Sequence, residues 1–411
     1  MAISNQTYLL RVNLTTGNTS REPIPEDYLT MFLGGRVLGD IYLYNELDAG
    51  IDPLSPQNKL IFGVGPLTGT NVVGSSRYIV HTKSPLTGIY MSSLAGGYFG
   101  PAMKRANYNQ IIIEGKSERP VYVSISNDNI ELRDAGPMWG MTTGDTQDFI
   151  KSDLKDSEVR IACIGPAGEN LVPYASILSE KRAVGRGGAG AVMGSKNLKA
   201  VAVRGTGKAS VADPDAFRRA ARRAIKDIAN NPTMKNQFPL YGSQVAMPLL
   251  SEGGIIPWNN WQDSCHPEAD NLFAVNWREK FVRKDVRCAP PCTMMCSKIS
   301  LVTEGPHAGA LTEGPEYETE YALGACCGIT DQAAVIEADA LCDQYGLDTI
   351  SMGVSVAFAM ECYEKGIIDN SDTRGLEIRF GQGQLLRKLI HDTAYCRDFG
   401  EVLSKGTQKM S

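Results

Sequence analysis

The feature that most constrains this chain is a cluster of three closely spaced cysteines, Cys288, Cys292 and Cys296. Pro290 and Pro291 lie between the first two. Because proline lacks a backbone N–H and fixes φ, this segment cannot be helical and must form a loop around whatever the sulfurs share. No other stretch is so rich in soft metal ligands, so the sequence predicts an iron or zinc site here.

Three other uses of these thiols remain open. A disulfide is disfavoured because the start of the chain, residues 1–6, has neither the basic nor the apolar region of a signal peptide, which points to a reducing cytoplasm. A structural zinc needs four sulfur or nitrogen ligands, and His266 and His307 are each isolated. Thiols that only pack in the core are the third alternative. We favour an iron–sulfur cluster, whose fourth thiolate must come from elsewhere.

Bulk properties define the general class of the chain. A length of 411 residues favours two domains, and 43% hydrophobic with 21% charged residues is typical of a globular protein. The net charge of −5 gives no general affinity for nucleic acid or anionic membranes. No apolar run reaches the roughly 18 residues that a membrane span needs. We therefore expect a cytoplasmic protein that binds neither nucleic acid nor membrane.

The first half of the chain has the pattern of a β-rich domain. Short runs rich in β-branched residues are bounded by Gly, Pro, Asn and Asp, which is typical of strands. The expected strands cover residues 8–14, 59–64, 77–82, 110–114, 121–126, 130–133, 159–164 and 199–203. The sequence thus predicts a sheet-rich domain over residues 1–208.

The second half, residues 209–411, is expected to be mainly helical. Asp213 and Pro214 form an N-cap and a first-turn proline, and apolar residues then recur at helical spacing. Further helices are predicted over about residues 330–345 and 349–366, each ending at a glycine. The fold class predicted is therefore α+β, a β-rich domain followed by a helical one.

The junction between those two helices carries a carboxylate at each end, Asp343 and Asp348. Asp348 has the position of a helix N-cap, which is one interpretation. The other is that both carboxylates accept hydrogen bonds from a planar heterocycle rich in N–H donors. The sequence leaves both open.

Three glycine-rich loops are expected in the β-rich half. The segment Gly185 to Gly190 matches G-x-G-x-x-G, but it lacks the βαβ context of a dinucleotide site. We interpret it as an anion-binding loop with cations nearby. These cations are Arg182, Arg186, Lys196 and Lys199. The other two loops cover residues 68–77 and 92–97, and together they suggest a large anionic cofactor.

Long blocks of this sequence resemble the aldehyde ferredoxin oxidoreductase family from about residue 8 to the end. The matching blocks are residues 52–56, 58–62, 65–70, 83–88, 96–101, 182–188, 193–200, 313–319 and 343–348. The resemblance implies a tungsten or molybdenum bis-pyranopterin cofactor beside a [4Fe–4S] cluster, with Mg²⁺ bridging the pterin phosphates as a further expectation.

The resemblance also implies particular site residues. Positions that match the family's pterin contacts are Arg77, Gly96, Arg182 and Ala183 in the β-rich half, and Asp343, Leu347 and Asp348 in the D-x-x-G-L-D stretch. Cys288, Cys292 and Cys296 resemble three cluster ligands. Glu313 is the first choice for a carboxylate near the metal, with Glu318 second.

The implied function is oxidation of an aldehyde to a carboxylate, with electrons passing through the cluster to ferredoxin or a ferredoxin-like subunit. Reduction of an acid or acyl thioester by the same redox site is an alternative. A homo-oligomer is compatible with the sequence.

Two departures from the family pattern matter. The cysteine loop reads C-x₃-C-x₃-C where the family usually shows C-x₂-C-x₃-C. The chain also stops before the family's final third, which supplies the fourth cluster cysteine, a second aspartate motif and a histidine. We therefore expect a separate polypeptide to supply that third, or else a shortened or non-catalytic fragment that binds pterin or a cluster. Cys326, Cys327 and Cys342 are expected to be packing thiols.

Overall fold

The computed structural model describes residues 7–289 and 292–411 and divides into two compact units. The first comprises residues 1–226 with Cys288–Cys292, and the second comprises residues 227–287 and 293–411. The division falls within α7 (Pro214–Asn230), while the predicted domain boundary at residue 208 precedes that helix. Pro290 and Pro291, on which the loop prediction rests, lie outside the described residues.

The first unit contains two six-stranded sheets. The strand order of the first sheet is β2-β1-β6-β3-β4-β5 and that of the second is β11-β10-β9-β12-β7-β8. The first sheet consists of β1 (Tyr8–Asn13), β2 (Thr19–Pro23), β3 (Leu60–Val64), β4 (Tyr78–Lys83), β5 (Tyr90–Ala95) and β6 (Tyr108–Glu114). The second consists of β7 (Val121–Ser126), β8 (Asn129–Asp134), β9 (Arg160–Cys163), β10 (Ile177–Ser179), β11 (Arg182–Val184) and β12 (Leu198–Arg204).

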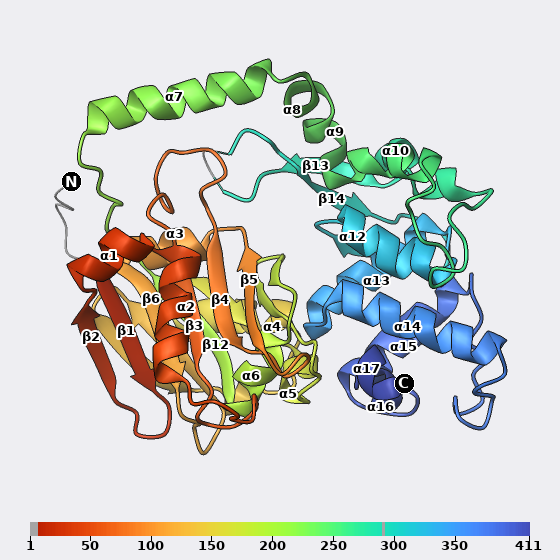
Figure 1. Cartoon of the computed structure of the whole chain (residues 1–411), viewed down its shortest axis with the longest axis horizontal. Coiled ribbons are helices and arrows are strands. Elements are labelled where there is room, and N and C mark those ends of the chain that lie inside the picture. Colours follow the sequence, from red (N-terminus) through yellow and green to blue (C-terminus); the bar gives the residue numbers. More distant parts are fainter. Residues whose placement is uncertain (1–6, 290–291) are drawn as a thin grey trace. The chain divides into compact units, whose positions relative to one another are not determined.

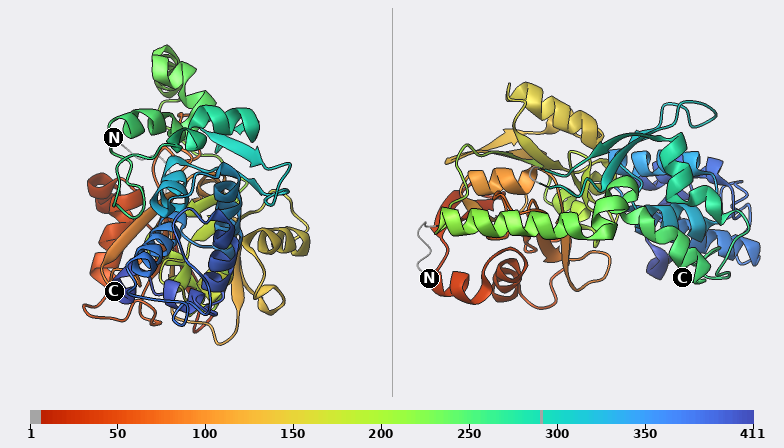
Figure 2. Two further views of the ribbon diagram at one scale, coloured as in Figure 1. Left: turned by 90° about the vertical axis from the view of Figure 1, so that its right-hand side faces the viewer. Right: turned by 90° about the horizontal axis from the view of Figure 1, so that it is seen from above.

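The main core of this unit lies between the two sheets. It combines buried apolar side chains from both sheets with those of α3 (Phe99–Arg105) and α6 (Ala189–Ser195). The outer face of the first sheet packs against α1 (Glu26–Phe32) and α2 (Gly35–Glu46), and that of the second against α4 (Thr143–Asp153). Figure 2 shows these helices on opposite sides of the sheets. The remaining helix is the short α5 (Pro166–Glu169). The central strands, such as β3, β6 and β12, are therefore buried on both faces, which explains their continuous apolar runs, whereas the edge strands β2 and β8 are half-buried or exposed.

The second unit is mainly helical (Figure 1). Its α-helices, besides the end of α7, are α8 (Pro232–Asn236), α9 (Phe238–Tyr241), α10 (Met247–Glu252), α11 (Ala274–Lys280), α12 (Tyr317–Thr319), α13 (Gln332–Tyr345), α14 (Thr349–Glu364), α15 (Leu386–Ala394), α16 (Gly400–Leu403) and α17 (Thr407–Met410). A small antiparallel sheet is formed by β13 (Val282–Val286), β14 (Ser297–Leu301) and β15 (Leu311–Thr312). The predicted fold class, a β-rich domain followed by a helical one, is confirmed.

The structure corrects one local prediction and adds a short strand that no prediction covered. Residues 92–95, which we expected in a glycine-rich loop, form the second half of β5, because Ser92 and Ser93 pair with His81 and Val80 of β4. The segment before Gly185 forms the short strand β11, which is antiparallel to β10. An antiparallel edge strand cannot begin a βαβ unit, so the loop after β11 is still not a dinucleotide site.

Candidate functional site

The ends of β4 and β5 bring two of the predicted cofactor-binding residues together. These strands are antiparallel and Tyr78 pairs with Ala95, so Arg77 and Gly96 are the next residues outward at the same end of the ladder. A Cβ atom built on Gly96 would lie 3.7 Å from Nη1 of Arg77. The guanidinium therefore lies over a backbone position that carries no side chain.

The third predicted residue, Arg182, comes from β11 at the same edge. A Cβ atom on Gly97 would lie 3.5 Å from Cγ of Arg182 and 2.9 Å from Oε2 of Glu180. Gly97 also has φ +97, which L side chains rarely adopt. Ala183 follows Arg182 in β11 and pairs with Leu178 of β10. Contacts between β5 and β11 therefore place two arginines beside the glycine pair.

Cys288 lies against this edge, within the first unit. Its Sγ atom is 3.4 Å from Oγ of Ser76, and a Cβ atom on Gly96 would lie 3.3 Å from its Cβ atom. Cys292 belongs to the same unit and is buried. One predicted cluster ligand thus lies beside the predicted cofactor-binding arginine and glycine, although these residues are about 200 positions apart in the sequence.

The surroundings of Cys288 stabilise its thiolate. A hydrogen bond with Cys292, a second with Ser76, and the charges of Arg182 and Arg77 lower the pKa of the Cys288 thiol to about 4, against the opposing effect of burial. The thiol is therefore ionised at neutral pH, which is the form that binds metal. Ser76 was not named among the predicted site residues. It does lie in the predicted loop over residues 68–77, directly before Arg77, and that position was the sequence signal for a role in the site.

The donor set of this edge fits the groups that the resemblance implies. Two arginines beside two glycines suit phosphate oxygens that approach the backbone, and an ionised thiol suits iron. Within residues 7–289 and 292–411, however, no three His, Cys, Asp or Glu side chains are grouped so as to hold a metal ion. Cys296 belongs to the second unit. Ligation by all three cysteines therefore stays a prediction.

The cysteines that we expected to pack in the core do so. Cys326, Cys327 and Cys342 are fully buried, and burial raises the pKa of each thiol. The Cys327 thiol donates to the carbonyl oxygens of Ala322 and Gly353, each at 3.4 Å. These thiols are neutral at pH 7 and stabilise the helical packing.

Two of the four cations that we expected near the glycine loop at residues 185–190, Lys196 and Lys199, are not available to bind an anion. Lys196 is fully buried, and its Nζ donates to the backbone carbonyls of Pro56, Asn58 and Gly115. Lys199 is also fully buried and pairs with Glu169. Both ammonium groups are used inside the protein, so the expectation that they bind an external anion was wrong.

In the second unit, Asp348 is the N-cap of α14. Its Oδ1 accepts the backbone N–H of Ile350 at 3.1 Å, and its Oδ2 accepts the hydroxyl of Ser351 at 2.5 Å. The capping interpretation of Asp348 is therefore confirmed. Gly346 ends α13 in a left-handed backbone conformation, with φ +74. Leu347, the next residue, is buried. Asp343, in the last turn of α13, is half-buried.

The two glutamates predicted near the metal lie on either side of a turn. Glu313 is half-buried directly after β15, and Glu318 is exposed within α12. The structure adds a third carboxyl, Glu320, which is fully buried. Sequence reasoning missed it, although a charged residue before the apolar run from Tyr321 to Leu323 was a signal.

Glu320 is held by two glutamine side chains. Its Oε2 accepts hydrogen bonds from Nε2 of Gln332 at 2.9 Å and Nε2 of Gln244 at 3.2 Å. Burial raises the pKa of Glu320 to about 8, so the carboxyl is mostly neutral at pH 7. Nε2 of Gln244 also donates to the carbonyl oxygen of Pro315 at 2.8 Å. This cluster therefore supports the turn that contains Glu313.

Comparisons with known proteins agree with this mixed α/β fold. The model of the aldehyde ferredoxin oxidoreductase N-terminal domain matches residues 9–205, and the model of domains 2 and 3 matches residues 219–411. The chain therefore belongs to the aldehyde ferredoxin oxidoreductase family.

Individual relatives share much of the sequence. The tungsten-containing aldehyde ferredoxin oxidoreductase of Pyrococcus horikoshii is 42% identical over 407 residues, covering 98% of this chain and 66% of that protein. The aliphatic sulfonate oxidoreductase WOR-like subunit of Pyrococcus furiosus is 33% identical, with the same coverage. The chain thus spans 66% of the length of these relatives.

A solved structure shows the same fold. The active site complex BamBC of benzoyl coenzyme A reductase, in complex with 1,5-dienoyl-CoA, includes a chain that superposes with a TM-score of 0.86 at 31% identity. The match covers 98% of this chain and 63% of that chain. Within the described part of the sequence, no helix combines the length and apolar character that crossing a membrane requires.

Proposed function

We propose that this chain is an oxidoreductase component that oxidises aldehydes to carboxylic acids at a tungsten or molybdenum pterin centre. In the overall reaction, an aldehyde and water give a carboxylate, three protons and two electrons. The electrons then pass through a [4Fe–4S] cluster to ferredoxin or a ferredoxin-like subunit.

The observation that carries this proposal is the grouping of Arg77, Gly96 and Arg182 with Cys288. A cofactor-binding edge next to a cluster ligand is the arrangement that electron transfer from one group to the other requires. Family membership alone does not dictate that these particular side chains meet, since they come from four separate segments of the chain.

The proposed residues of the two units would bind different parts of the cofactors. Arg77 and Arg182 bind phosphate oxygens of the cofactor, while Gly96 and the small side chain of Ala183 let it approach the backbone. In the second unit, Asp343 and Asp348 accept hydrogen bonds from pterin N–H groups, and Leu347 packs beside the ring. Cys288, Cys292 and Cys296 would bind the cluster, and Mg²⁺ is a further expected member of the cofactor set.

When bound, the metal–pterin group accepts two electrons from the substrate, and the cluster passes them on singly. The chain itself supplies the proton acceptor. Glu313 is the first choice because its half-buried carboxylate follows β15 directly, and Glu318 is the second. The neutral carboxyl of Glu320 holds the turn in place without adding a negative charge beneath it.

A second candidate function is reduction of an acyl thioester. The similarity to the benzoyl coenzyme A reductase complex, at 31% identity over 98% of this chain, supports a CoA thioester as the substrate but not reduction at its thioester bond, because the 1,5-dienoyl-CoA in that complex keeps the thioester. The same redox site running in the opposite direction would need a reductant of low potential, such as reduced ferredoxin.

One pair of assays separates the two candidates. Anaerobically purified protein, together with any polypeptide that co-purifies, is mixed with aliphatic and aromatic aldehydes and oxidised benzyl viologen. The proposal predicts aldehyde-dependent viologen reduction. Oxidation of reduced viologen by benzoyl-CoA with release of free CoA, without oxidation of any aldehyde, would support the thioester reductase instead, whereas oxidation without release of CoA would indicate reduction of the ring. A preparation that holds metal and cluster but catalyses neither reaction would contradict both and indicate a non-catalytic component.

A further inference from the structure

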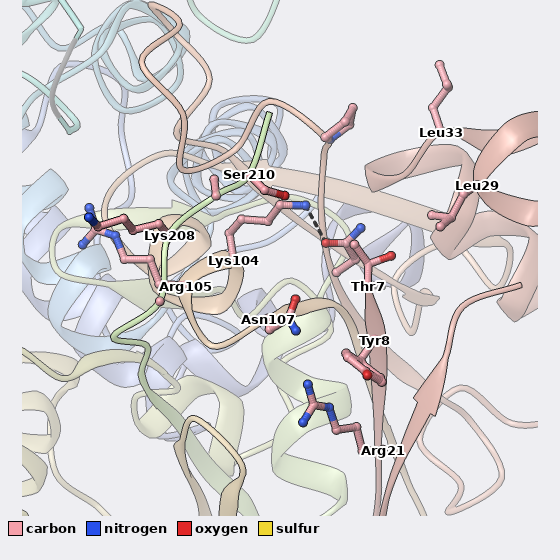
Figure 3. A pocket seen from close by; sticks show the side chains of 14 residues that line it. Thr7, Tyr8, Arg21, Leu29, Leu33, Lys104, Arg105, Asn107, Lys208 and Ser210 are labelled. Carbon is pink, nitrogen blue, oxygen red and sulfur yellow. Dashed lines mark hydrogen bonds between the residues drawn. The ribbon is translucent and has the colours of Figure 1, made fainter. Parts of the chain in front are cut away.

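A cavity of about 570 Å³ lies in the first unit. It is lined by the start of β1, by β2, by α1, by the end of α3 and by the segment after β12 (Figure 3). None of the predicted cofactor-binding residues lines it. Its volume is in the range of sites that bind small organic molecules.

The charged side chains that line this cavity are all cationic. They are Arg21, Lys104, Arg105 and Lys208, and the described lining contains no aspartate or glutamate. Arg21 is partly neutralised, because it pairs with Asp128 and its guanidinium lies 3.6 Å from the centre of the Tyr8 ring. The remaining three cations give the cavity a positive potential that would attract an anion.

Lys104 has a neutral hydrogen-bond partner and no carboxylate partner within the described residues. Its Nζ donates to Oδ1 of Asn109 at 2.7 Å, the contact marked in Figure 3. Burial lowers the pKa of Lys104 to about 8. Lys196, by contrast, is fully buried but donates to three carbonyl oxygens. Lys104 is half-buried, and an ammonium that donates to one neutral acceptor keeps further N–H donors available for an anion.

A hydroxyl group that lines the cavity has no hydrogen-bond partner within the described part of the chain. Its oxygen is the Oγ1 atom of Thr7, which is buried. Buried hydroxyl groups are nearly always hydrogen-bonded, so one that lines a cavity indicates a missing acceptor or donor. Thr7 and Lys104 both line this cavity.

Two glycines hold Lys208 beside the end of α3. A Cβ atom on Gly205 would lie 2.3 Å from the carbonyl oxygen of Ala102, and one on Gly207 would lie 2.6 Å from that of Arg105. The backbone N–H of Gly207 donates to the same Arg105 carbonyl at 3.0 Å. The close approach of these backbones therefore fixes Lys208 next to Arg105, on the same side of the cavity (Figure 3).

Leu29 and Leu33 lie on the side of the cavity opposite Arg105 and Lys208 (Figure 3), and Pro66 also lines it. Leu33 is 67% exposed and has φ +59, a backbone conformation that is unfavourable for leucine. An apolar side chain held there by a strained backbone is available to pack against a ligand. Cations on one side and apolar side chains on the other match a ligand that has an anionic head and an organic body.

We propose that this cavity binds a small organic phosphate. Lys104, Arg105 and Lys208 bind the phosphate oxygens, the hydroxyl of Thr7 donates to one of them, and the organic part packs against Leu29, Leu33 and Pro66. A phosphate monoester carries the charge and the oxygen acceptors that three cations and a hydroxyl require. This site is independent of the proposed aldehyde chemistry.

Calorimetric titration of the full chain with AMP tests this proposal, with adenosine and benzoate as comparison probes. We expect AMP to bind, adenosine to bind much more weakly, and Lys104→Met to weaken AMP binding by about tenfold or more, because a charge-assisted hydrogen bond is lost. Lys116→Met removes an exposed lysine outside the cavity and serves as the matched control.

Arg105→Gln gives a second test that does not depend on a buried position, because Arg105 is exposed. It should weaken AMP binding, while its fold stays unchanged by circular dichroism. Absence of AMP binding at millimolar concentration would overturn the proposal. So would equal affinities for AMP and adenosine, benzoate binding as tight as that of AMP, or affinities in Lys104→Met and Arg105→Gln that equal that of Lys116→Met.

Discussion

The cationic edge of the first unit and the acidic junction of the second unit were both predicted as cofactor sites, yet they differ in how they are stabilised. At the junction, each oxygen of the Asp348 carboxylate accepts a hydrogen bond from the first turn of its own helix. At the edge, the Cys288 thiolate is stabilised by Cys292, Ser76 and two arginines from other segments.

This difference decides how strongly each region indicates function. A capping carboxylate contributes to helix stability by itself, so Asp348 would be explained without any cofactor. An ionised cysteine beside two arginines contributes little to packing, and such a thiolate is typical of ligands and nucleophiles. The edge therefore supports the proposed function more directly than the junction does.

The largest effect is expected from Cys288→Ser. Because a hydroxyl is a poor substitute for a thiolate, iron should fall from about four atoms per chain to nearly none. Iron is measured by elemental analysis after anaerobic purification, with circular dichroism to show that the first unit stays folded. Cys265→Ser, at an exposed cysteine, is the matched control and should keep its iron. Equal iron in the two variants would contradict the assignment of Cys288.

A smaller effect is expected from Glu320→Gln in the second unit. Burial raises the pKa of Glu320 in the folded state to about 8, whereas an unfolded glutamate titrates near about 4.3. The folded state therefore holds this proton more tightly. Its contribution to stability is complete below about pH 4 and is lost as the pH rises through about 8.

The variant should lose this pH dependence, because an amide keeps the hydrogen bonds and does not titrate. We expect Glu320→Gln to be more stable than the wild type at about pH 9, by an amount on the order of a few kcal/mol. Urea unfolding at several pH values measures this difference. The exposed Glu304→Gln serves as control. A pH dependence in Glu320→Gln equal to that of the wild type would show that this carboxyl is not kept neutral.

The smallest effect separates the two roles of Asp348. Asp348→Ala should lower the free energy of unfolding by about 1 kcal/mol, while Asp348→Asn should lower it by much less, because asparagine is also a good N-cap. Asp331 caps α13 in the same way, through a 3.0 Å bond from Ala333, so Asp331→Ala should show the same loss of stability.

Cofactor content then distinguishes the two caps. If Asp348 also binds a pterin, Asp348→Asn should lose tungsten or molybdenum at nearly unchanged stability, whereas Asp331→Ala should retain it. Full metal content in a stable Asp348→Asn variant would leave the cap as the only role of this carboxylate.

Local sequence patterns predicted much of the fold. Strands such as β3 and β7 follow from their β-branched and apolar residues, the end of α13 follows from Gly346, and the start of α14 follows from Asp348. These signals are local, so they need no knowledge of which segments pair.

The features that the sequence analysis missed depend on contacts between segments that are far apart in the sequence. The small polar residues Ser92 and Ser93 read as a loop, but pairing with β4 makes them strand. Lys196 looked like a surface cation, yet carbonyl oxygens from residues 56, 58 and 115 enclose it. The cationic cavity combines segments from Thr7 to Lys208, and no sequence window contains them together.

The most direct test of the central claim is the metal content of anaerobically purified protein, with the masses of all chains in the same sample determined alongside. Tungsten, molybdenum, iron and zinc are counted per chain. We expect close to one tungsten or molybdenum and about four irons per chain. Zinc in place of iron, or a preparation without tungsten, molybdenum and iron, would contradict it.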